Sequence, residues 1–161
     1  MEPYQRILAA IDFSSHARLV VEHAAVLARE LKAELIFINV INQRDIDAIY
    51  HSIDLLKNDF KKISSQRCID QLHEERHKNM EELEKSTDLS TIKTRFIVRT
   101  GIPFQELLAS VAEEKVEMLI MGIKGRSDLA DVMVGSTALK MFKRCPVPLV
   151  TVRKNKPSEK Q

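Results

Sequence analysis

Short apolar runs alternate along the chain with longer stretches in which apolar residues recur at helical spacing. An unbroken apolar run of five to nine residues is typical of a strand that is buried on both faces, as in a parallel sheet. The pattern predicts five strands, at residues 6–11, 33–41, 92–98, 117–121 and 148–153.

Helical patterns lie between most of these strands. One begins after the N-cap candidates Ser14 and Ser15 and continues to Lys32, and two more cover residues 104–114 and 138–143. The order is β-α-β, a long connection, then β-α-β-α-β. It predicts an α/β fold, a single-domain layered structure with a parallel sheet, helices on both faces and right-handed crossovers.

The long connection, residues 42–90, is rich in charges of both signs. Apolar residues from Ile53 to Leu83 recur along it at helical spacing. We predict a loop or lid followed by one long or broken helix.

The length and the net charge of the chain argue against some classes of function. A chain of 161 residues fits one domain, and a net charge of +2, with basic and acidic residues interspersed, does not favour nucleic acid as a partner. The apolar runs are far shorter than the roughly 20 residues that span a bilayer, and Met1-Glu2-Pro3 does not open a signal peptide. We expect a cytoplasmic protein that binds neither nucleic acid nor membrane.

The two cysteines, Cys68 and Cys145, are isolated in the sequence and show no C-x-x-C spacing. A disulfide framework or a zinc knuckle therefore has little support, and we predict reduced, buried structural thiols.

Glycine provides the main indication of function. Gly122, Gly125 and Gly135 follow an apolar run that ends at Met121, and Ser136-Thr137 then opens a helical stretch. Glycines at the end of a strand let a ligand approach main-chain N–H groups, and a helix N-terminus attracts anions. The spacing predicts a phosphate cradle. A structural loop with a serine N-cap is the alternative interpretation.

Asp12 follows the first predicted strand. In parallel sheets ligands bind at the carboxyl ends of strands where the strand order reverses, so Asp12 and the glycine loop are expected to face one cleft. The carboxylate is suited to accept hydrogen bonds from ribose hydroxyls or a base amino group. Its alternative role is that of a turn or N-cap residue.

One further motif lies in the long connection: His73-Glu74-Glu75-Arg76-His77 matches H-E-x-x-H. This spacing suits a zinc hydrolase. The stretch is highly charged, however, and no third ligand motif follows it, so we interpret it as solvated helix surface. Whether His73 and His77 bind a metal stays open.

Four segments together resemble the ATP-binding branch of the universal stress protein family. They are Ile11-Asp12-Phe13-Ser14, Gly122-Ile123-Lys124-Gly125-Arg126-Ser127, Gly135-Ser136-Thr137 and Cys145-Pro146-Val147-Pro148. The resemblance covers residues 3–153. It implies a flavodoxin-like or adenine-nucleotide α-hydrolase-like fold, with five parallel strands in the order 3-2-1-4-5, and a homodimer formed through residues 148–153.

The resemblance also implies a binding site for ATP, ADP or AMP, usually with Mg²⁺. Asp12 would bind the adenosine end, the main chain of Val40 the adenine, and the glycine loop with Arg126 the triphosphate. The implied binding residues are Ala10, Ile11, Asp12, Val40, Met121, Gly122, Gly125, Arg126, Gly135, Ser136 and Thr137. No catalytic residue and no protein ligand to a metal is implied.

These features favour a nucleotide-dependent regulatory module in the stress response, formed by residues 1–153 and followed by a disordered tail at 154–161. A slow ATPase or autophosphorylating enzyme on the same site is the first alternative, with Asp128 and Asp131 as the nearby carboxylates. A dimeric interaction protein without nucleotide is the second.

Overall fold

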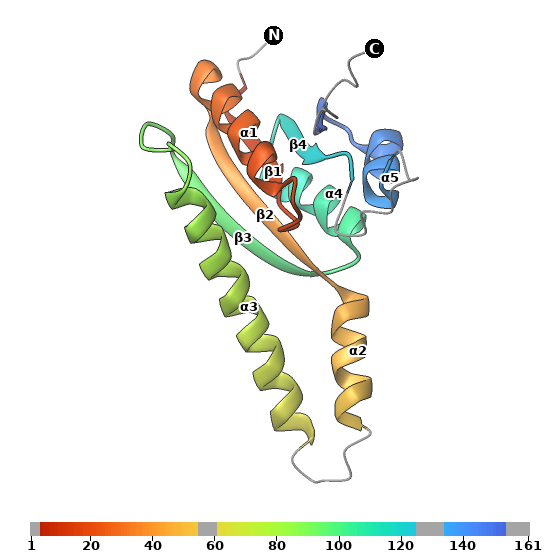
Figure 1. The fold of residues 1–161 in the computed structure, drawn as a ribbon. Helices are drawn as coiled ribbons and strands as arrows, with labels where there is room; N and C mark the ends of the chain where they lie inside the picture. Colours follow the sequence, from red (N-terminus) through yellow and green to blue (C-terminus); the bar gives the residue numbers. More distant parts are fainter. Residues whose placement is uncertain (1–3, 55–60, 125–133, 154–161) are drawn as a thin grey trace, which may run out of the picture.

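The computed structural model describes residues 4–54, 61–124 and 134–153, with side chains except at 53, 54 and 61–65. Figure 1 shows the arrangement of its helices and strands. In chain order they are β1 (Arg6–Ala10), α1 (Ala17–Leu31), β2 (Glu34–Asn42), α2 (Gln43–Asp54), α3 (Lys61–Lys85), β3 (Thr94–Gly101), α4 (Pro103–Glu113), β4 (Met118–Gly122), α5 (Ser136–Arg144) and β5 (Leu149–Val152).

The strands form one parallel sheet in the order β3-β2-β1-β4-β5. The predicted layered α/β fold and its strand order are therefore confirmed. β1 lies at the centre, where Leu8 pairs with Ile36 of β2 on one side and with Leu119 of β4 on the other. The strand order reverses between β1 and β4, and the connections that diverge there leave room for a ligand at the carboxyl ends of these strands.

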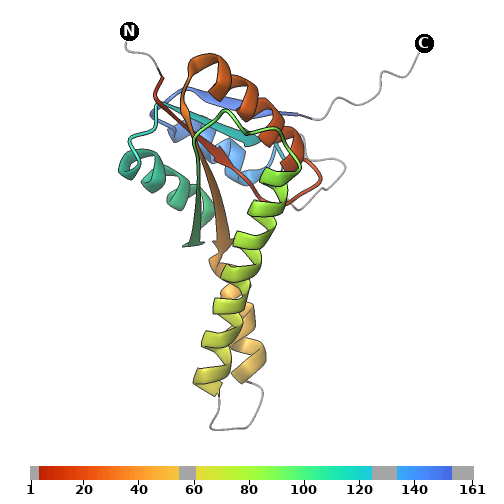
Figure 2. The same ribbon diagram turned by 90° about the vertical axis from the view of Figure 1, so that its left-hand side faces the viewer.

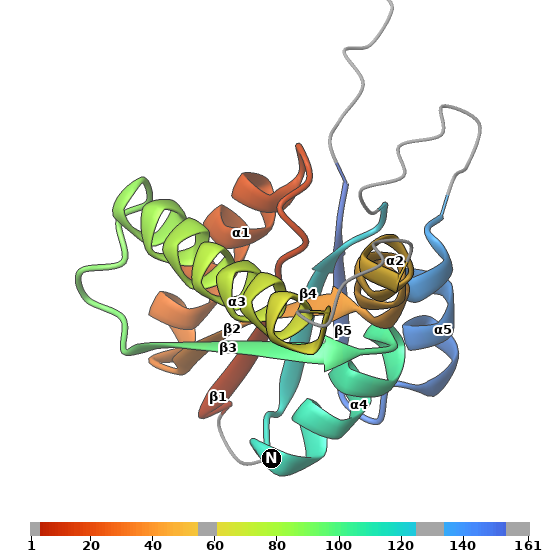
Figure 3. The ribbon, with the colours of Figure 1, turned by 90° about the horizontal axis from the view of Figure 1, so that it is seen from below.

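Helices cover both faces of the sheet, with α1 and α3 on one side and α4 and α5 on the other (Figure 3). Successive side chains of β1 point into opposite cores: Ile7 and Ala9 pack under α1, whereas Leu8 packs with α4 and α5. Because each face is covered, both sets of positions are apolar. This explains why the strand reads as an unbroken apolar run.

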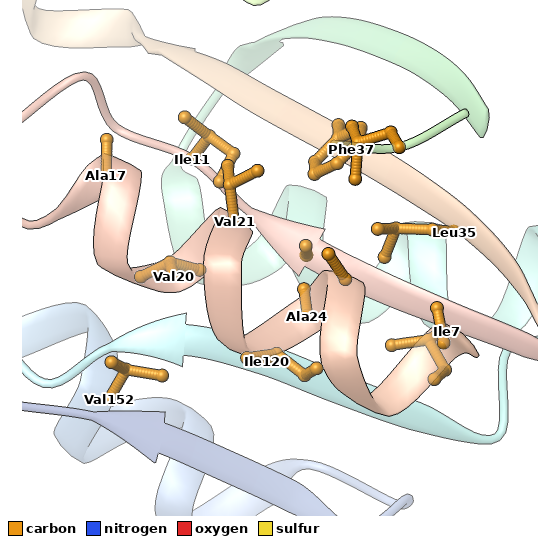
Figure 4. Close-up of a cluster of buried hydrophobic side chains, with 14 of the residues drawn as sticks. Ile7, Ile11, Ala17, Val20, Val21, Ala24, Leu35, Phe37, Ile120 and Val152 are labelled. Carbon is orange, nitrogen blue, oxygen red and sulfur yellow. The ribbon is translucent and has the colours of Figure 1, made fainter. Parts of the chain in front are cut away.

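The core under α1 is closely packed (Figure 4). Val20, Val21 and Ala24 of α1 lie against the sheet beside Phe37 and Ile120, and all five are at most 2% exposed. Small side chains on the helix let its backbone approach the strands closely. This core fixes β1 and β4, the two strands whose ends carry the candidate site.

The long connection differs from the prediction, because α2 begins directly after β2 in place of a loop. Asn42 starts the helix by accepting a hydrogen bond from the Arg44 amide at its Oδ1 (3.1 Å). α2 and the first part of α3 extend together beyond the sheet (Figures 1 and 2). We call this helix pair the arm. Met80, at 1% exposure, anchors the far end of α3 in the core.

The observed starts of β3 and α1 differ from the predicted ones, because local hydrogen bonds form turns there. β3 starts at Thr94 because the Ile92 amide donates to Leu89 in a turn, and it extends to Gly101, which pairs with Asn42 of β2. Ser14 and Ser15 do not cap α1. His16 is the N-cap without a side-chain cap bond, and Ser14 accepts from its amide.

The expectation of two buried thiols is wrong for Cys68, which is exposed on α3, whereas Cys145 is partly buried. Cys68 lies on a helix that contacts the sheet only along one side, so a small apolar residue there need not be buried.

A cluster of charges ties the sheet to α4. Arg95 of β3 donates to Glu34 of β2 (3.1 Å) and to Glu114 at the end of α4 (2.7 Å), and Lys93 contacts the same Glu34 carboxylate (3.2 Å). Burial alone would raise the pKa of Glu34, but the hydrogen bonds and charges of Lys93 and Arg95 outweigh it and lower that pKa below 4.5. Glu34 therefore stabilises the fold in its ionised form.

We expect Glu34→Gln to lower the free energy of unfolding by about 0.5–1 kcal/mol at pH 7. Because the pKa of Glu34 is lower in the folded than in the unfolded chain, its contribution is present above the unfolded pKa and is lost as the pH falls through the folded pKa. Urea unfolding of both proteins between pH 7 and pH 3 measures the difference. The exposed Glu30→Gln serves as control, and a penalty that persists unchanged at pH 3 would contradict the assignment.

Candidate functional site

A cavity of about 580 Å³ lies at the carboxyl ends of the central strands and the N-terminus of α5. Binding sites for small molecules commonly measure about 300–1,000 Å³. It occupies the place where the strand order reverses, between β1 and β4. The position and size fit a ligand as large as a nucleotide.

All predicted site residues that the structure describes line this one cavity. Gly125 and Arg126 lie outside the described residues. Those brought together are Ala10, Ile11, Asp12, Val40, Met121, Gly122, Gly135, Ser136 and Thr137. Their contacts to a ligand stay a prediction.

The two described glycines of the motif meet at the end of β4. The Gly135 amide donates to the carbonyl of Ile123 (2.8 Å), which brings the start of α5 beside the strand end. A Cβ at Gly122 would stand 3.1 Å from the carbonyl oxygen of Lys124. A side chain at position 122 would therefore crowd the backbone of the turn, and this close approach favours glycine.

The start of α5 is open to an anion. Gly135 is the N-cap, in an extended conformation, and no side chain among the residues that the structure describes caps the helix. The first amides of a helix have no intrahelical acceptor and carry the positive end of its dipole. The alternative of a serine N-cap is wrong, since Ser136 is the first residue of the helix and is exposed. These amides are available to a phosphate.

Asp12 has the turn role considered for it and also lies at the cavity, while its contact with a ligand stays a prediction. Its Oδ1 accepts a hydrogen bond from the Ser14 amide (3.0 Å), which closes a turn, and the residue also lines the cavity. Phe13, inside this turn, has a φ of 55°, a left-handed conformation that a bulky residue rarely adopts. The turn is therefore held in place by its surroundings.

Sequence reasoning missed a group of cavity residues. Asn42 is the last residue of β2, Arg44 lies in α2, and Pro103 and Leu107 lie in α4. The signal for the first two was the polar sequence that follows the predicted strand 33–41, which we interpreted as a loop. Arg44 and Lys124 both line the cavity, so basic groups outnumber the single carboxylate of Asp12 among the described cavity residues.

The H-E-x-x-H motif forms no metal centre in the part of the chain that the structure describes, where no group of three potential ligands is assembled. His73 is partly buried, and its Nε2 lies 3.0 Å from Thr100 Oγ1 of β3. His77 is exposed. The motif thus attaches α3 to the sheet edge, and its interpretation as wholly solvated surface is wrong for His73.

A family model with the description "Universal stress protein family" matches residues 3–153. The chain belongs to the universal stress protein family. Among curated relatives, the universal stress protein MJ0577 of Methanocaldococcus jannaschii is 25% identical over 94% of this chain and 96% of its own length. The universal stress protein YxiE of Bacillus subtilis is 26% identical over 93% of this chain and 99% of its own.

Solved structures of universal stress proteins share the fold. That of MJ0577 has a TM-score of 0.76 at 26% identity and covers 96% of this chain and 100% of its own. A universal stress protein in complex with cAMP (TM-score 0.59, 17% identity, 96% of this chain and 100% of its own) also matches. So does one from Archaeoglobus fulgidus in complex with dAMP (0.55, 14%, 94% and 100%).

Within the residues that the structure describes, no helix has both the length and the apolar character needed to cross a membrane.

We expect Gly122→Val to cost about 1–3 kcal/mol of stability, because its side chain would press on the Lys124 carbonyl and on Val20. Thermal unfolding measures the loss. Ser136→Ala, at an exposed position without a cap bond, should leave the midpoint unchanged. Equal midpoints for Gly122→Val and the parent protein would show that the turn has room for a side chain.

Proposed function

We propose that this universal stress protein binds an adenine nucleotide, ATP first among them, and acts as a nucleotide-dependent regulatory module. One observation carries the proposal: the uncapped N-terminus of α5 opens into a nucleotide-sized cavity at the switch point of the sheet. The polar residues of the lining suit a phosphate chain, and the apolar residues suit an aromatic ring system.

The cavity is lined by both polar and apolar residues. The amides at the start of α5, with Ser136 and Thr137, would bind the phosphates, and Lys124 also lines the cavity. Asp12 would accept hydrogen bonds from the ribose hydroxyls. The main chain of Val40 would contact the adenine, with Leu107 and Met121 as apolar neighbours. Mg²⁺ would enter with the phosphates and be held by them.

Other members of the family support the choice of ligand. Two structural neighbours were solved in complex with cAMP and with dAMP, which share adenine, a sugar and a phosphate group. At sequence identities of 17% and 14%, these neighbours support the fold alone. The argument for an adenine nucleotide in this chain therefore depends on its own cavity.

Binding is favoured over hydrolysis by the groups that the cavity contains. Attack on a γ-phosphate needs a residue that orients the water or takes its proton. Asp12, the one carboxylate among the described cavity residues, is engaged with the Ser14 amide at the sugar end of the proposed pose. Asp128 and Asp131 lie outside the described residues. A nucleotide that stabilises one conformation suffices for regulation.

The remaining parts of the proposal are a cytoplasmic location, one nucleotide-binding domain over residues 1–153, and a homodimer through β5. β5 is an edge strand, which leaves backbone groups available to a second copy. On the neighbouring α5, Phe142 and Leu139 are 78% and 46% exposed. This apolar surface is suited to burial between two copies.

Replacing Gly135 tests phosphate binding. Gly135→Asp places a carboxylate at the N-cap, which suits the helix but repels a phosphate, whereas Gly135→Asn offers the same shape without charge. By calorimetry with Mg-ATP, we expect the aspartate variant to bind at least about tenfold more weakly than the asparagine variant.

Unfolding midpoints for both variants should equal or exceed that of the parent, since both residues cap helices well. Equal ATP affinities for the two variants would contradict phosphate binding at α5, and the absence of any heat from the parent protein would refute the proposed function.

The dimer depends on backbone groups of β5. Leu119 donates to Pro148 and Ile123 donates to Val152, so alternation along the strand turns the Thr151 amide toward the open edge. Thr151→Pro removes that donor without breaking the β4 ladder, and we expect it to give monomers in light scattering after size exclusion. Thr151→Val keeps the amide and should stay dimeric. A dimeric Thr151→Pro would place the interface elsewhere.

A further inference from the structure

A second, small cavity adjoins the first and shares Asp12 and Val40 with it. Its volume is about 20 Å³. A cavity of more than about 10–15 Å³ holds one water molecule. The lining residues are Asp12, Asn39, Val40, Ile41, Asp45 and Arg76.

Two residues of this lining each have a buried side-chain atom for which the described part of the chain provides no hydrogen-bond partner. Among the described side chains, these are Asn39 Oδ1 and Arg76 Nε. Asn39 is only 4% exposed, and an unpaired buried polar group costs about 1–3 kcal/mol. One atom is an acceptor and the other carries a proton to donate. A single water would accept from Arg76 and donate to Asn39, which satisfies both.

The same two residues hold the turn that carries Asp12. Asn39 Nδ2 donates to the Ile11 carbonyl (2.7 Å) at the start of the turn. The Arg76 guanidinium carbon lies 5.5 Å from the centre of the Phe13 ring, within the range of a cation–π contact. Phe13 has a φ of 55°, a left-handed conformation that costs a residue with a side chain about 1–2 kcal/mol. The contacts of Asn39 and Arg76 therefore act on the strained part of the turn.

We infer that Arg76 is a positioning residue of the nucleotide site. With one ordered water bound between its Nε and Asn39 Oδ1, it holds the turn at residues 11–14 in the conformation that presents Asp12 to the large cavity. The inference rests on the proposed function for what Asp12 binds, whereas the water site and the held turn belong to the protein without nucleotide.

This assignment links the arm to the site. Arg76 lies on α3, which continues into the arm (Figure 2). The consecutive residues Arg44 and Asp45 of α2 line the large and the small cavity respectively. Residues of both α2 and α3 therefore line the small cavity next to the turn that carries Asp12.

The test compares Arg76→Met, which keeps apolar length but removes the donor and the charge, with Arg67→Met at an exposed position on the same helix. Hydrogen exchange of the nucleotide-free proteins reports on residues 12–16. Calorimetry with Mg-ATP is then done in the parent and in an Asp12→Asn background. Arg76→Lys replaces Arg76→Met if the latter does not fold.

We expect Arg76→Met to speed exchange at residues 12–16 at least about fivefold and to weaken ATP binding about fivefold in the parent background but less than about twofold with Asp12→Asn. Arg67→Met should change neither. Unchanged exchange in the turn, or an equal loss of affinity in both backgrounds, would overturn the role of Arg76. A parent protein that binds no nucleotide would refute the proposed function, and the exchange result would still decide the role of Arg76.

Discussion

The fold and the candidate site both depend on the position of β1 between two neighbouring strands. The strand is hydrogen-bonded to β2 on one side and β4 on the other, and its side chains are buried in two separate cores. Because β1 cannot move without disturbing both cores, the strand ends that carry Asp12 and Gly122 are fixed relative to each other. The relative positions of the two halves of the candidate site are fixed in the same way. Its two halves are far apart in sequence, yet they share one cavity because their strands are neighbours.

Much of the fold was predictable because burial on both faces leaves a strong signal. The five apolar runs identify the strands, and the order of strands and helices indicates a parallel sheet. That Asp12 and the described glycines would line one cavity was predictable, since the carboxyl ends of neighbouring parallel strands meet at the same edge of a sheet. The order of the strands came from the family resemblance, because periodicity does not reveal which strands are neighbours.

The residues that were missed depend on tertiary context. Arg44 lines the cavity only because α2 begins without a loop after β2, and the polar composition of that stretch suits a loop equally well. The role of Arg76 was hidden for a similar reason. In the sequence, Arg76 is one of many charged residues between positions 42 and 90. In the structure, its guanidinium group lies over the ring of Phe13. Long-range contacts of charged side chains leave no periodic trace in a sequence.

We propose that the cavity at the ends of β1 and β4 holds an adenine nucleotide. The most direct test is to denature freshly purified protein and identify the released small molecules by mass spectrometry, with added Mg-ATP for any protein that emerges empty. We expect an adenine nucleotide to be released in an amount comparable to the protein, or ATP to be bound when it is added. A protein that releases no nucleotide and binds none would contradict nucleotide binding at this cavity.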